Sequence, residues 1–346
     1  MQPELSPLHK FGGKKVSTFR LVNKKGTEAI ISNYGAILLS FRIIKEDGSI
    51  NDIVLGFDKP EDYLDEKYLK TYPMFGAAVG RYGNRIKNGK MVIDGIQYQL
   101  PLNIGTDHLH GGVTGFDKKV WNVDIFDDKV NFLQLSLTSA DGEEGYPGNL
   151  KVSIRFELND DNELSHEYIA TTDKATAVNL THHSYFNLDN GNGRVDNQFI
   201  KINAASILEQ DENLTTNGNL VNVSGTRYDF REAHRMADRW GNEEGYDQSF
   251  VVNKKERELA WVAEAWSDES NTKLEVATTE PIVHFYTGIW IPAVVGKNNT
   301  QYAPYSGFCF ETQAHPNAIN IPSFPNTILR PGEVYTQKTI YKVSNI

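Results

Sequence analysis

The sequence is poor in cysteine, since Cys309 is the only one among 346 residues. An intramolecular disulfide is therefore excluded, and so is a zinc site built from four cysteines. The chain also has no uninterrupted apolar stretch of the roughly 18 residues that a membrane-spanning helix requires. Its amino-terminal segment lacks the apolar core of a secretory signal. These absences predict a soluble, cytoplasmic protein that does not act in a membrane.

Positive charge is scarce as well. The chain has 35 Lys and Arg residues and 45 Asp and Glu residues, which gives a formal net charge of −10. Nucleic-acid-binding proteins gather Lys and Arg on one face, and no such run occurs here. Nucleic acid is therefore not an expected partner, and the acidic balance also disfavours a strongly anionic ligand.

Helical patterns are few and short. Only residues 60–70 and 229–240 are predicted helices, and each has about the length of an average helix. Period-two alternation of apolar and polar residues, which is typical of strands, dominates the rest. It predicts three sets of side chains that each share a strand face: Trp121, Val123 and Ile125; Leu133, Leu135 and Leu137; and Leu150, Val152, Ile154, Phe156 and Leu158.

Turn signals support the same fold class. Asp94-Gly95 separates two strand-like runs and predicts a hairpin, because both central residues of its turn need positive φ. No Pro- or Ser-rich linker and no change of composition divides the chain. The sequence therefore predicts an all-β fold, in which residues 1–346 form one large, mostly antiparallel domain with few short helices.

Four of the nine histidines fall into two close pairs, His108 with His110 and His182 with His183. On a strand, a His-x-His spacing puts two rings on one face, where they can begin a zinc site, but no third ligand is evident. The alternative for this pair is a buried, hydrogen-bonded histidine at a strand end. The adjacent His182 and His183 should point to opposite faces, so only one of them faces a given site.

Glycines surround two further candidate segments. "HGG" at 110–112 permits unusual backbone angles or a close backbone approach to a ligand, and it is also a common turn. "VGRYGNRIKNGK" at 79–90 places Arg81, Asn84 and Arg85 where they can donate to sugar or phosphate oxygens. Two solvated arginines beside a turn are the alternative. The segment lacks the Gly-Lys-Ser/Thr ending of a phosphate-binding loop.

A carboxylate stands in the apolar strand "GFCFETQ". Burying Glu311 there is unfavourable unless it has partners, and a carboxylate in such surroundings suits a general base. Alternation places Cys309, Glu311 and Gln313 on one face, so that Glu311 and Gln313 can contact one ligand; a solvent-facing strand residue is the alternative. Asp247 begins another strand-like run, either as a turn residue or as an acceptor for ligand hydroxyls.

The candidate groups suit proton transfer on a neutral, hydroxyl-rich molecule. No G-x-S-x-G nucleophile motif is present. With this set of motifs, the sequence resembles the aldose 1-epimerases, also called galactose mutarotases. The matching segments occur in family order: "GRYGNRI" (80–86), "LHGG" followed by "GFDKKVW" (109–121), "DGEEGYPGNL" (141–150), "VNLTHHSYFNL" (178–188), "YDFR" (228–231), "GYDQSF" (245–250), "FYTG" (285–288) and "GFCFETQAHPNAIN" (307–320).

The resemblance implies a β-supersandwich with an open sugar cleft and no cofactor or metal. It assigns Glu311 as the general base, His183 as the general acid and His110 as the second active-site histidine. The implied reaction interconverts the α- and β-anomers of free aldohexoses such as galactose and glucose. A disaccharide such as maltose, a hexose 6-phosphate, and a sugar-binding module without activity remain alternatives.

The same resemblance implies the sugar contacts. Arg85 and Asp247 match the residues that position the sugar, and Asn84 and Gln313 are secondary contacts. The partner is thus a small sugar, and the chain is expected to be a monomer or a homodimer.

Three positions depart from the family pattern, and a fourth is variable. His182 stands where relatives commonly have Asn, His108 is at a variable position, His284 stands where Gln is frequent, and Trp290 is unusual. The departures at His284 and Trp290 bear on substrate range rather than on the chemistry.

Overall fold

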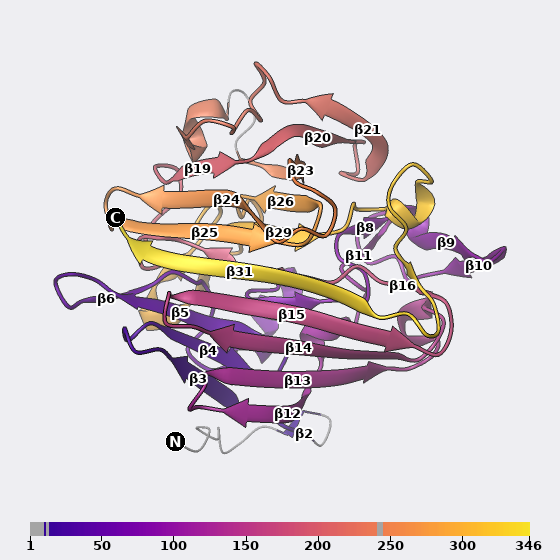
Figure 1. Cartoon of the computed structure of the whole chain (residues 1–346), viewed down its shortest axis with the longest axis horizontal. Helices are drawn as coiled ribbons and strands as arrows, with labels where there is room; N and C mark the ends of the chain where they lie inside the picture. The colour runs from indigo at the N-terminus through magenta and orange to yellow at the C-terminus, as the bar shows by residue number, and fades with distance from the viewer. Residues whose placement is uncertain (1–9, 12–13, 241–244) are drawn as a thin grey trace.

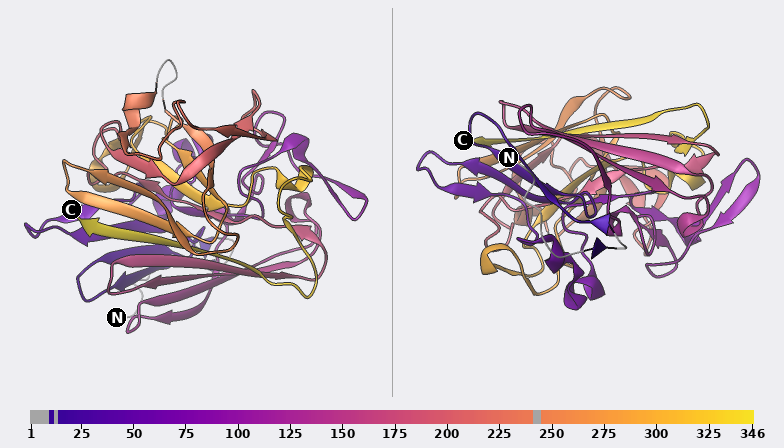
Figure 2. Two further views of the ribbon diagram at one scale, coloured as in Figure 1. Left: turned by 45° about the horizontal axis from the view of Figure 1, so that its top comes forward. Right: turned by 90° about the horizontal axis from the view of Figure 1, so that it is seen from below.

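The computed structural model describes residues 10–11, 14–240 and 245–346. Figure 1 looks onto the largest sheet, whose strands lie across the view one above the other. Seen from below, this sheet forms one layer over the remaining strands (Figure 2, right). All ladders of the two largest sheets are antiparallel, so the predicted all-β, antiparallel sandwich is confirmed.

Three sheets carry most of the strands. The nine-stranded sheet contains, in spatial order, β12 (Asn122–Asp127), β13 (Phe132–Ser139), β14 (Leu150–Leu158), β15 (Glu163–Thr172), β31 (Tyr335–Asn345), β25 (Thr272–Thr278), β24 (Ala260–Ser267), β19 (Phe199–Ile202) and β22 (His234–Arg235). The six-stranded sheet contains β18 (Tyr185–Phe186), β29 (Phe308–Gln313), β26 (Ile282–Tyr286), β23 (Asp247–Val252), β20 (Ala204–Gln210) and β21 (Thr216–Asn222). The four-stranded sheet contains β3 (Thr18–Val22), β4 (Glu28–Ser32), β5 (Leu38–Ile44) and β6 (Ile50–Asp52).

The other strands form short two-stranded ladders. They pair β1 (Lys10–Phe11) with β2 (Lys14–Lys15), β7 (Ala77–Val79) with β17 (Thr181–His183), β8 (Arg85–Ile86) with β11 (His108–Leu109), β9 (Lys90–Ile93) with β10 (Ile96–Gln99), β16 (Thr176–Ala177) with β30 (Ile328–Leu329), and β27 (Val294–Val295) with β28 (Gln301–Tyr302). The hairpin predicted at Asp94-Gly95 joins β9 to β10, and both residues have positive φ, at 52° and 78°.

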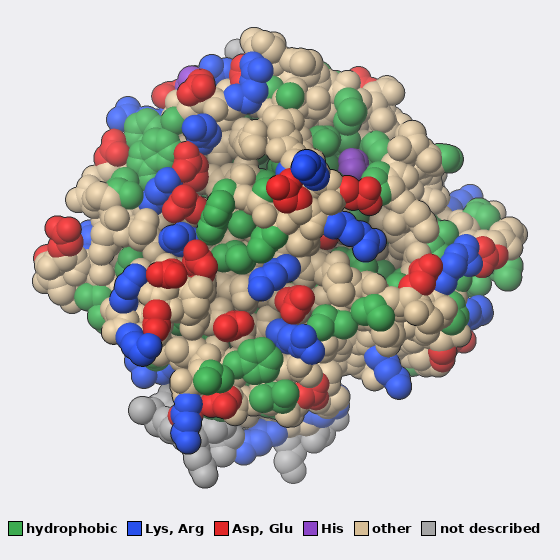
Figure 3. Space-filling view, viewed as in Figure 1, with side chains coloured by type: hydrophobic (Ala, Val, Ile, Leu, Met, Phe, Trp, Pro, Cys, Tyr) green, Lys and Arg blue, Asp and Glu red, His purple; other side chains and the backbone are tan. Residues whose placement is uncertain are grey.

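Alternation decides which strand faces are buried. On β14 every second residue from Leu150 to Leu158 is buried, and Leu133, Leu135 and Leu137 are buried on β13. These side chains join one core cluster with apolar residues of the six-stranded and four-stranded sheets. The opposite face of the large sheet carries charged side chains with smaller apolar patches between them (Figure 3).

The prediction for the edge strand β12 is wrong in part. Trp121 precedes the strand and is buried, whereas Val123 and Ile125 are 42% and 48% exposed. A bulge between Val123 and Ile125 shifts the register, because Val123 pairs with Leu135 while Ile125 pairs with Gln134. The extra residue breaks the period of two, so the three side chains do not share a face.

The first predicted helix is present as two short pieces. The 3-10 helix η1 (Pro60–Leu64) is followed by α1 (Glu66–Thr71), because the Asp65 side chain accepts hydrogen bonds from the backbone N–H groups of Lys67 and Tyr68 and caps a new helix. Further 3-10 turns include η2 (Lys87–Gly89), η3 (Phe116–Lys118), η4 (Glu143–Gly145), η6 (Lys297–Asn299) and η7 (Ala318–Asn320). Within the described ranges, no helix combines the length and apolar character needed to cross a membrane.

The second predicted helix, at 229–240, is wrong. The segment forms β22 and the 3-10 helix η5 (Met236–Arg239) instead. Arg235 pairs with Phe199 of β19, and the Met236 N–H donates to the Gln198 carbonyl. Pairing with the edge of the large sheet therefore overrides the helical pattern of this segment.

Candidate active site

The six-stranded sheet presents an apolar face to the core and a polar face to a cleft. Phe285, Phe308 and Phe310 lie on the apolar face and pack against one another. On the polar face, the strand register aligns Ser249, His284 and Glu311 in one row and Asp247, Tyr286 and Cys309 in the row two residues away. Strand alternation thus gathers groups that are far apart in the sequence.

The cleft has a volume of about 640 Å³, which suits a small polar ligand. Its inner part is lined by Asn84, Arg85, His110, His183, Tyr185, Asp247, His284, Tyr286 and Glu311. Its mouth is lined by Lys70, Tyr72, Asn103, Ile104, Val113, Lys118 and Trp290, among others.

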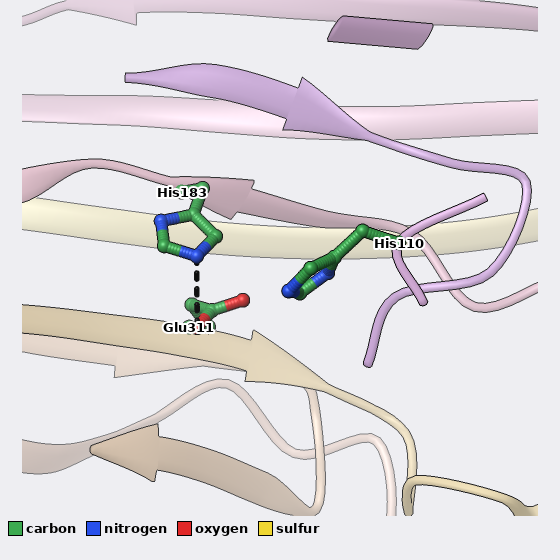
Figure 4. A group of neighbouring side chains, drawn as sticks. All are labelled: His110, His183 and Glu311. Atoms are coloured by element: carbon green, nitrogen blue, oxygen red, sulfur yellow. Dashed lines mark ion pairs between the residues drawn. The ribbon is translucent and has the colours of Figure 1, made fainter. Parts of the chain in front are cut away.

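Three predicted catalytic residues converge in the inner cleft (Figure 4). His183 Nε2 lies 3.6 Å from Glu311 Oε1, and the rings of His110 and His183 are 5.3 Å apart between centroids. One potential ligand or proton-transfer atom of each residue lies within 4.8 Å of the others. Glu311 is 1% exposed, and its Oε2 has no hydrogen-bond partner among the described residues.

Packing fixes the orientation of the His183 ring. The ring stacks on Tyr185, with 5.0 Å between centroids, and its Nδ1 lies 3.6 Å from Cys309 Sγ. Burial raises the pKa of Cys309 well above its usual 9.0, so this neighbour remains a thiol. His183 therefore presents Nε2, rather than Nδ1, to Glu311.

His110 is held as a neutral hydrogen-bond donor. Its Nδ1 accepts a hydrogen bond of 3.2 Å from the Asn84 backbone N–H, so the ring proton lies on Nε2. Burial, followed by the charges of His183, Arg85 and His284, holds the pKa of His110 well below its usual 6.5. This ring can donate a hydrogen bond, but it does not carry a spare proton near neutral pH.

The glycines after His110 allow the backbone to turn so that the His110 ring points into the cleft. His110, Gly111 and Gly112 all have positive φ, at 49°, 81° and 106°. A Cβ at Gly111 would lie 1.9 Å from the Gly80 carbonyl oxygen, so only glycine fits this approach of two backbones. The sequence motif "HGG" thus ends β11 and turns the His110 ring toward the cleft.

The predicted sugar-binding residues divide into two groups. Arg85, Asn84 and Asp247 line the cleft, and the Arg85 guanidinium makes no hydrogen bond to another described residue. Gln313 lies on the same strand face as Glu311 but is fully buried outside the cleft lining. Its amide nitrogen and oxygen have no partner within the described part of the chain.

The expectation that His108 and His110 share one strand face is wrong. His108 Nδ1 bonds to the Pro101 carbonyl at 2.7 Å, and its Nε2 bonds to the Tyr146 hydroxyl at 2.8 Å. With both ring nitrogens occupied and the ring outside the cleft lining, His108 is not available as a zinc ligand. The positive φ of His110 separates the two rings.

Two other polar residues from the candidate motifs are structural. His182 points away from His183, as strand alternation predicts, and its ring nitrogens bond to Ser184 at 3.0 Å and to the Ala36 carbonyl at 3.2 Å. Arg81 is 2% exposed and donates hydrogen bonds to the backbone carbonyls of Ser139, Ala140 and Pro147. Arg85 is therefore the arginine of this motif that lines the cleft.

Sequence reasoning did not assign roles to several residues of the cleft wall. Tyr185 and Tyr286 pack around His183, and His284 bonds to Asp247. Period-two alternation in "IVHFY" places His284 and Tyr286 on one face of a strand. That signal identifies a shared face but not its neighbours, which depend on the pairing with β23 and β29.

The inner cleft also offers the donor set of a metal site. Two imidazoles and one carboxylate, from His110, His183 and Glu311, match the ligands of one class of catalytic zinc site. The same three groups are suited to moving protons on a ligand with hydroxyl groups, and the residues around them can bind such hydroxyls. The fold and the site together define an acid–base enzyme that acts on a small polyhydroxyl molecule.

Comparison with known proteins identifies the family. The sequence pattern of the aldose 1-epimerase family matches residues 17–342. The chain belongs to the aldose 1-epimerase family, which consists of isomerases.

Similar proteins cover nearly the whole chain. The chain is 39% identical over 337 residues to galactose mutarotase from Bos taurus, and the match covers 96% of this chain and 95% of that protein. It is 35% identical over 348 residues to aldose 1-epimerase from Escherichia coli K12, with 98% and 97% covered. An aldose epimerase homologue from C. elegans superimposes with a TM-score of 0.88 at 30% identity, covering 96% of this chain and 99% of that one. Galactose 1-epimerase from Lactobacillus acidophilus NCFM superimposes with a TM-score of 0.85 at 29% identity, covering 99% of both chains. The fold is thus the galactose mutarotase-like β-sandwich.

Proposed function

We propose that this protein is an aldose 1-epimerase that interconverts the α- and β-anomers of free aldohexoses such as galactose and glucose. The supporting observation is the 3.6 Å contact between His183 Nε2 and Glu311 Oε1 inside the cleft. In a cyclic sugar, the C1 hydroxyl and the ring oxygen are bonded to the same carbon. An acid and a base that act on these two oxygens must therefore lie close together.

In the proposed reaction, Glu311 removes the proton of the C1 hydroxyl while His183 donates a proton to the ring oxygen. The bond between C1 and the ring oxygen breaks, and C1 becomes an aldehyde. Rotation about the C1–C2 bond presents the other face of the aldehyde, and the ring closes with the two roles reversed. Each positioned proton-transfer group typically accelerates such a step by about 10²–10⁴-fold.

The neighbouring residues hold the sugar and stabilise charge. His110, with its proton on Nε2, donates to the sugar oxygen on which negative charge develops. Arg85 and Asp247 bind hydroxyls as donor and acceptor, and Asn84 adds a secondary contact. Gln313 lies on the same strand face as Glu311 but is buried outside the cleft lining, so a direct sugar contact would require its side chain to move into the cleft.

Polarimetry tests this function. Freshly dissolved α-D-galactose, α-D-glucose, β-maltose and glucose 6-phosphate are each followed with and without the protein. We expect a faster approach to an unchanged final rotation for galactose and glucose, and the rate ratios rank the substrates. No acceleration with any sugar, together with sugar binding measured by titration, would support a binding module instead.

The metal alternative predicts a different result with a chelator. If Glu311 and His183 transfer protons directly, exhaustive treatment with EDTA leaves the rate of mutarotation unchanged. If the three groups of the inner cleft hold an essential metal, EDTA abolishes the rate and added Zn²⁺ restores it. Metal analysis of the treated protein verifies that the chelator has removed any bound ion.

A disaccharide substrate is the second candidate, and Trp290 favours it. Trp290 lines the cleft mouth, is 59% exposed, and stacks on Tyr286 with 5.8 Å between ring centroids. Its backbone N–H also donates to the Tyr286 hydroxyl at 2.8 Å. A flat, exposed aromatic ring held in this way offers a stacking surface for a second sugar ring.

The disaccharide candidate predicts a selective effect of Trp290→Ala. If maltose is a substrate, its kcat/KM falls about tenfold, which corresponds to the loss of roughly 1.4 kcal/mol of stacking, while the value for glucose stays within about twofold. Equal losses for both sugars would show that Trp290 serves the inner sugar alone. Leu102, an exposed apolar residue outside the cleft lining, provides the control variant Leu102→Ala.

A hexose 6-phosphate remains an alternative, because Lys70 and Lys118 both line the mouth, although Lys118 is already engaged. The Lys118 ammonium donates to the Val113 carbonyl and lies 4.3 Å from the centre of the Tyr72 ring. It also lies 3.8 Å from the Asp117 carboxylate. A phosphate would have to compete with these partners for the lysine.

A further inference from the structure

A chain of polar contacts crosses the cleft floor beside Glu311. His284 lies on the central strand β26, between Ser249 on β23 and Glu311 on β29 in the register. Its Nε2 is 2.7 Å from Asp247 Oδ1, and its Nδ1 is 2.9 Å from the Ser249 hydroxyl. His284 is 3% exposed, so both contacts are shielded from solvent.

This array of serine, histidine and aspartate is not a nucleophilic site. Ser249 is 1% exposed and is absent from the cleft lining, so its hydroxyl cannot reach a ligand. The serine instead gives the His284 ring a fixed partner on the side away from Asp247. His284 is therefore oriented from two sides, and the contact that reaches the cleft is the one with Asp247.

The charges around His284 explain why a cation is favourable here. Two carboxylates, Asp247 and Glu311, lie on the strands on either side of it, and like charges in one buried site disfavour each other's ionisation. Burial lowers the pKa of His284, and so does the positive charge of Arg85. The hydrogen bond and charge of Asp247 and the charge of Glu311 outweigh both and raise the pKa of His284 above its usual 6.5. The charge of His284 also contributes to lowering the pKa of His110, which stays neutral.

The same arrangement favours the ionised form of Asp247. Burial alone raises the pKa of Asp247, but the hydrogen bond from His284 and then the charges of His284, Arg85 and His183 bring it below its usual 3.8. His284 holds Oδ1 of this carboxylate, and Oδ2 makes no hydrogen bond to a described residue. Oδ2 is thus the oxygen available for a sugar hydroxyl.

We propose that His284 is a positioning residue that, as an imidazolium between Ser249 and the two carboxylates, orients Asp247 and keeps it ionised for sugar binding. This inference rests on the proposed function only in taking Asp247 as a sugar ligand, and it does not depend on turnover. It assigns to His284 a role that acts through Asp247 and not through the reacting atoms.

The test is the pH dependence of the dissociation constant for galactose, measured by calorimetry from about pH 3 to about pH 8. Anomerically equilibrated galactose is used, so that turnover produces no net reaction. In the wild-type protein, the lowered pKa keeps Asp247 ionised, and affinity is lost only as the pH falls toward that low value. His284→Gln keeps a hydrogen-bond donor but removes the charge, and His284→Leu removes both.

When the hydrogen bond and the charge of His284 are removed, the burial of Asp247 is opposed only by the charges of Arg85 and His183, so its pKa rises and it takes up a proton at higher pH. The acid limb of the affinity curve should therefore move upward, by about one pH unit for His284→Gln and further for His284→Leu. His315→Gln is the matched control. His315 is a buried histidine outside the cleft lining whose ring packs on Phe324, and this variant should follow the wild-type curve.

Superimposed acid limbs in all four proteins would overturn the proposal, as would an affinity loss in His284→Gln that is equal at every pH. If His284→Leu does not fold, His284→Gln decides the outcome. A wild-type protein that binds galactose with the expected pH dependence but does not accelerate mutarotation would contradict the proposed function and leave this inference standing. Absence of galactose binding at every pH would overturn both.

Discussion

Replacing Glu311 with Gln is expected to lower the turnover number for galactose by about 10²–10⁴-fold while the dissociation constant changes by no more than about threefold. Gln preserves the size and shape of the side chain but cannot accept the proton of the C1 hydroxyl. The substitution acts on proton transfer because Oε1 of Glu311 faces His183, while its Oε2 has no hydrogen-bond partner among the described residues. Polarimetry gives the rate, and calorimetry gives the affinity.

Glu280 provides a demanding control for this experiment. Burial raises the pKa of Glu280 to about 7, against the charges of Lys254 and Arg257. Such a pKa alone would suit a general base at neutral pH. Glu280, however, lies in the turn after β25 and does not line the cleft. Glu280→Gln should keep near-native turnover; a loss as large as that of Glu311→Gln, or near-native turnover in Glu311→Gln, would contradict the assignment of the base.

Replacing His183 with Gln is expected to have an effect of similar size, about 10²–10⁴-fold on turnover, again with a small change in affinity. The imidazole donates a proton to the ring oxygen, and an amide cannot do so. Cys309 and Tyr185 hold the ring so that Nε2 faces Glu311, and a Gln side chain retains part of this packing. Turnover and affinity are measured with the same sugar and the same methods.

His182 supplies the neighbouring control. Its ring bonds to Ser184 and to the Ala36 carbonyl, in the core and away from the cleft. His182→Asn should therefore keep turnover within about threefold, because it removes no group that reaches the sugar. If His182→Asn loses activity while folded and His183→Gln keeps it, the roles of the two adjacent histidines are the reverse of those proposed.

The fold was largely predictable because alternation is a local property. The buried faces of β13 and β14 and the turn between β9 and β10 follow from residue order alone. The errors occur where tertiary contacts override local patterns. Residues 229–240 pair with the edge of the large sheet instead of forming a helix, and a bulge in β12 breaks the period of two.

Most of the candidate residues that the sequence indicated line one cleft, but their contacts with one another could not be predicted. Motifs that resemble the family pointed to Glu311, His183 and His110, whereas alternation alone showed only that Glu311 and Gln313 share a strand face. The contact of His284 with Asp247 depends on the register between β23 and β26, which no single segment encodes. For the same reason, the separation of His108 from His110 depends on the backbone turn at His110.

Exchange between the anomeric protons of galactose tests the central claim most directly. Nuclear magnetic resonance is recorded in D₂O at anomeric equilibrium, with catalytic amounts of protein and with buffer alone. Ring opening and closure predict rapid exchange between the α and β signals, and no deuterium at C1 or C2, because no C–H bond breaks. Exchange no faster than in buffer, or deuterium incorporation at C2, would contradict acid–base ring opening as the function of this cleft.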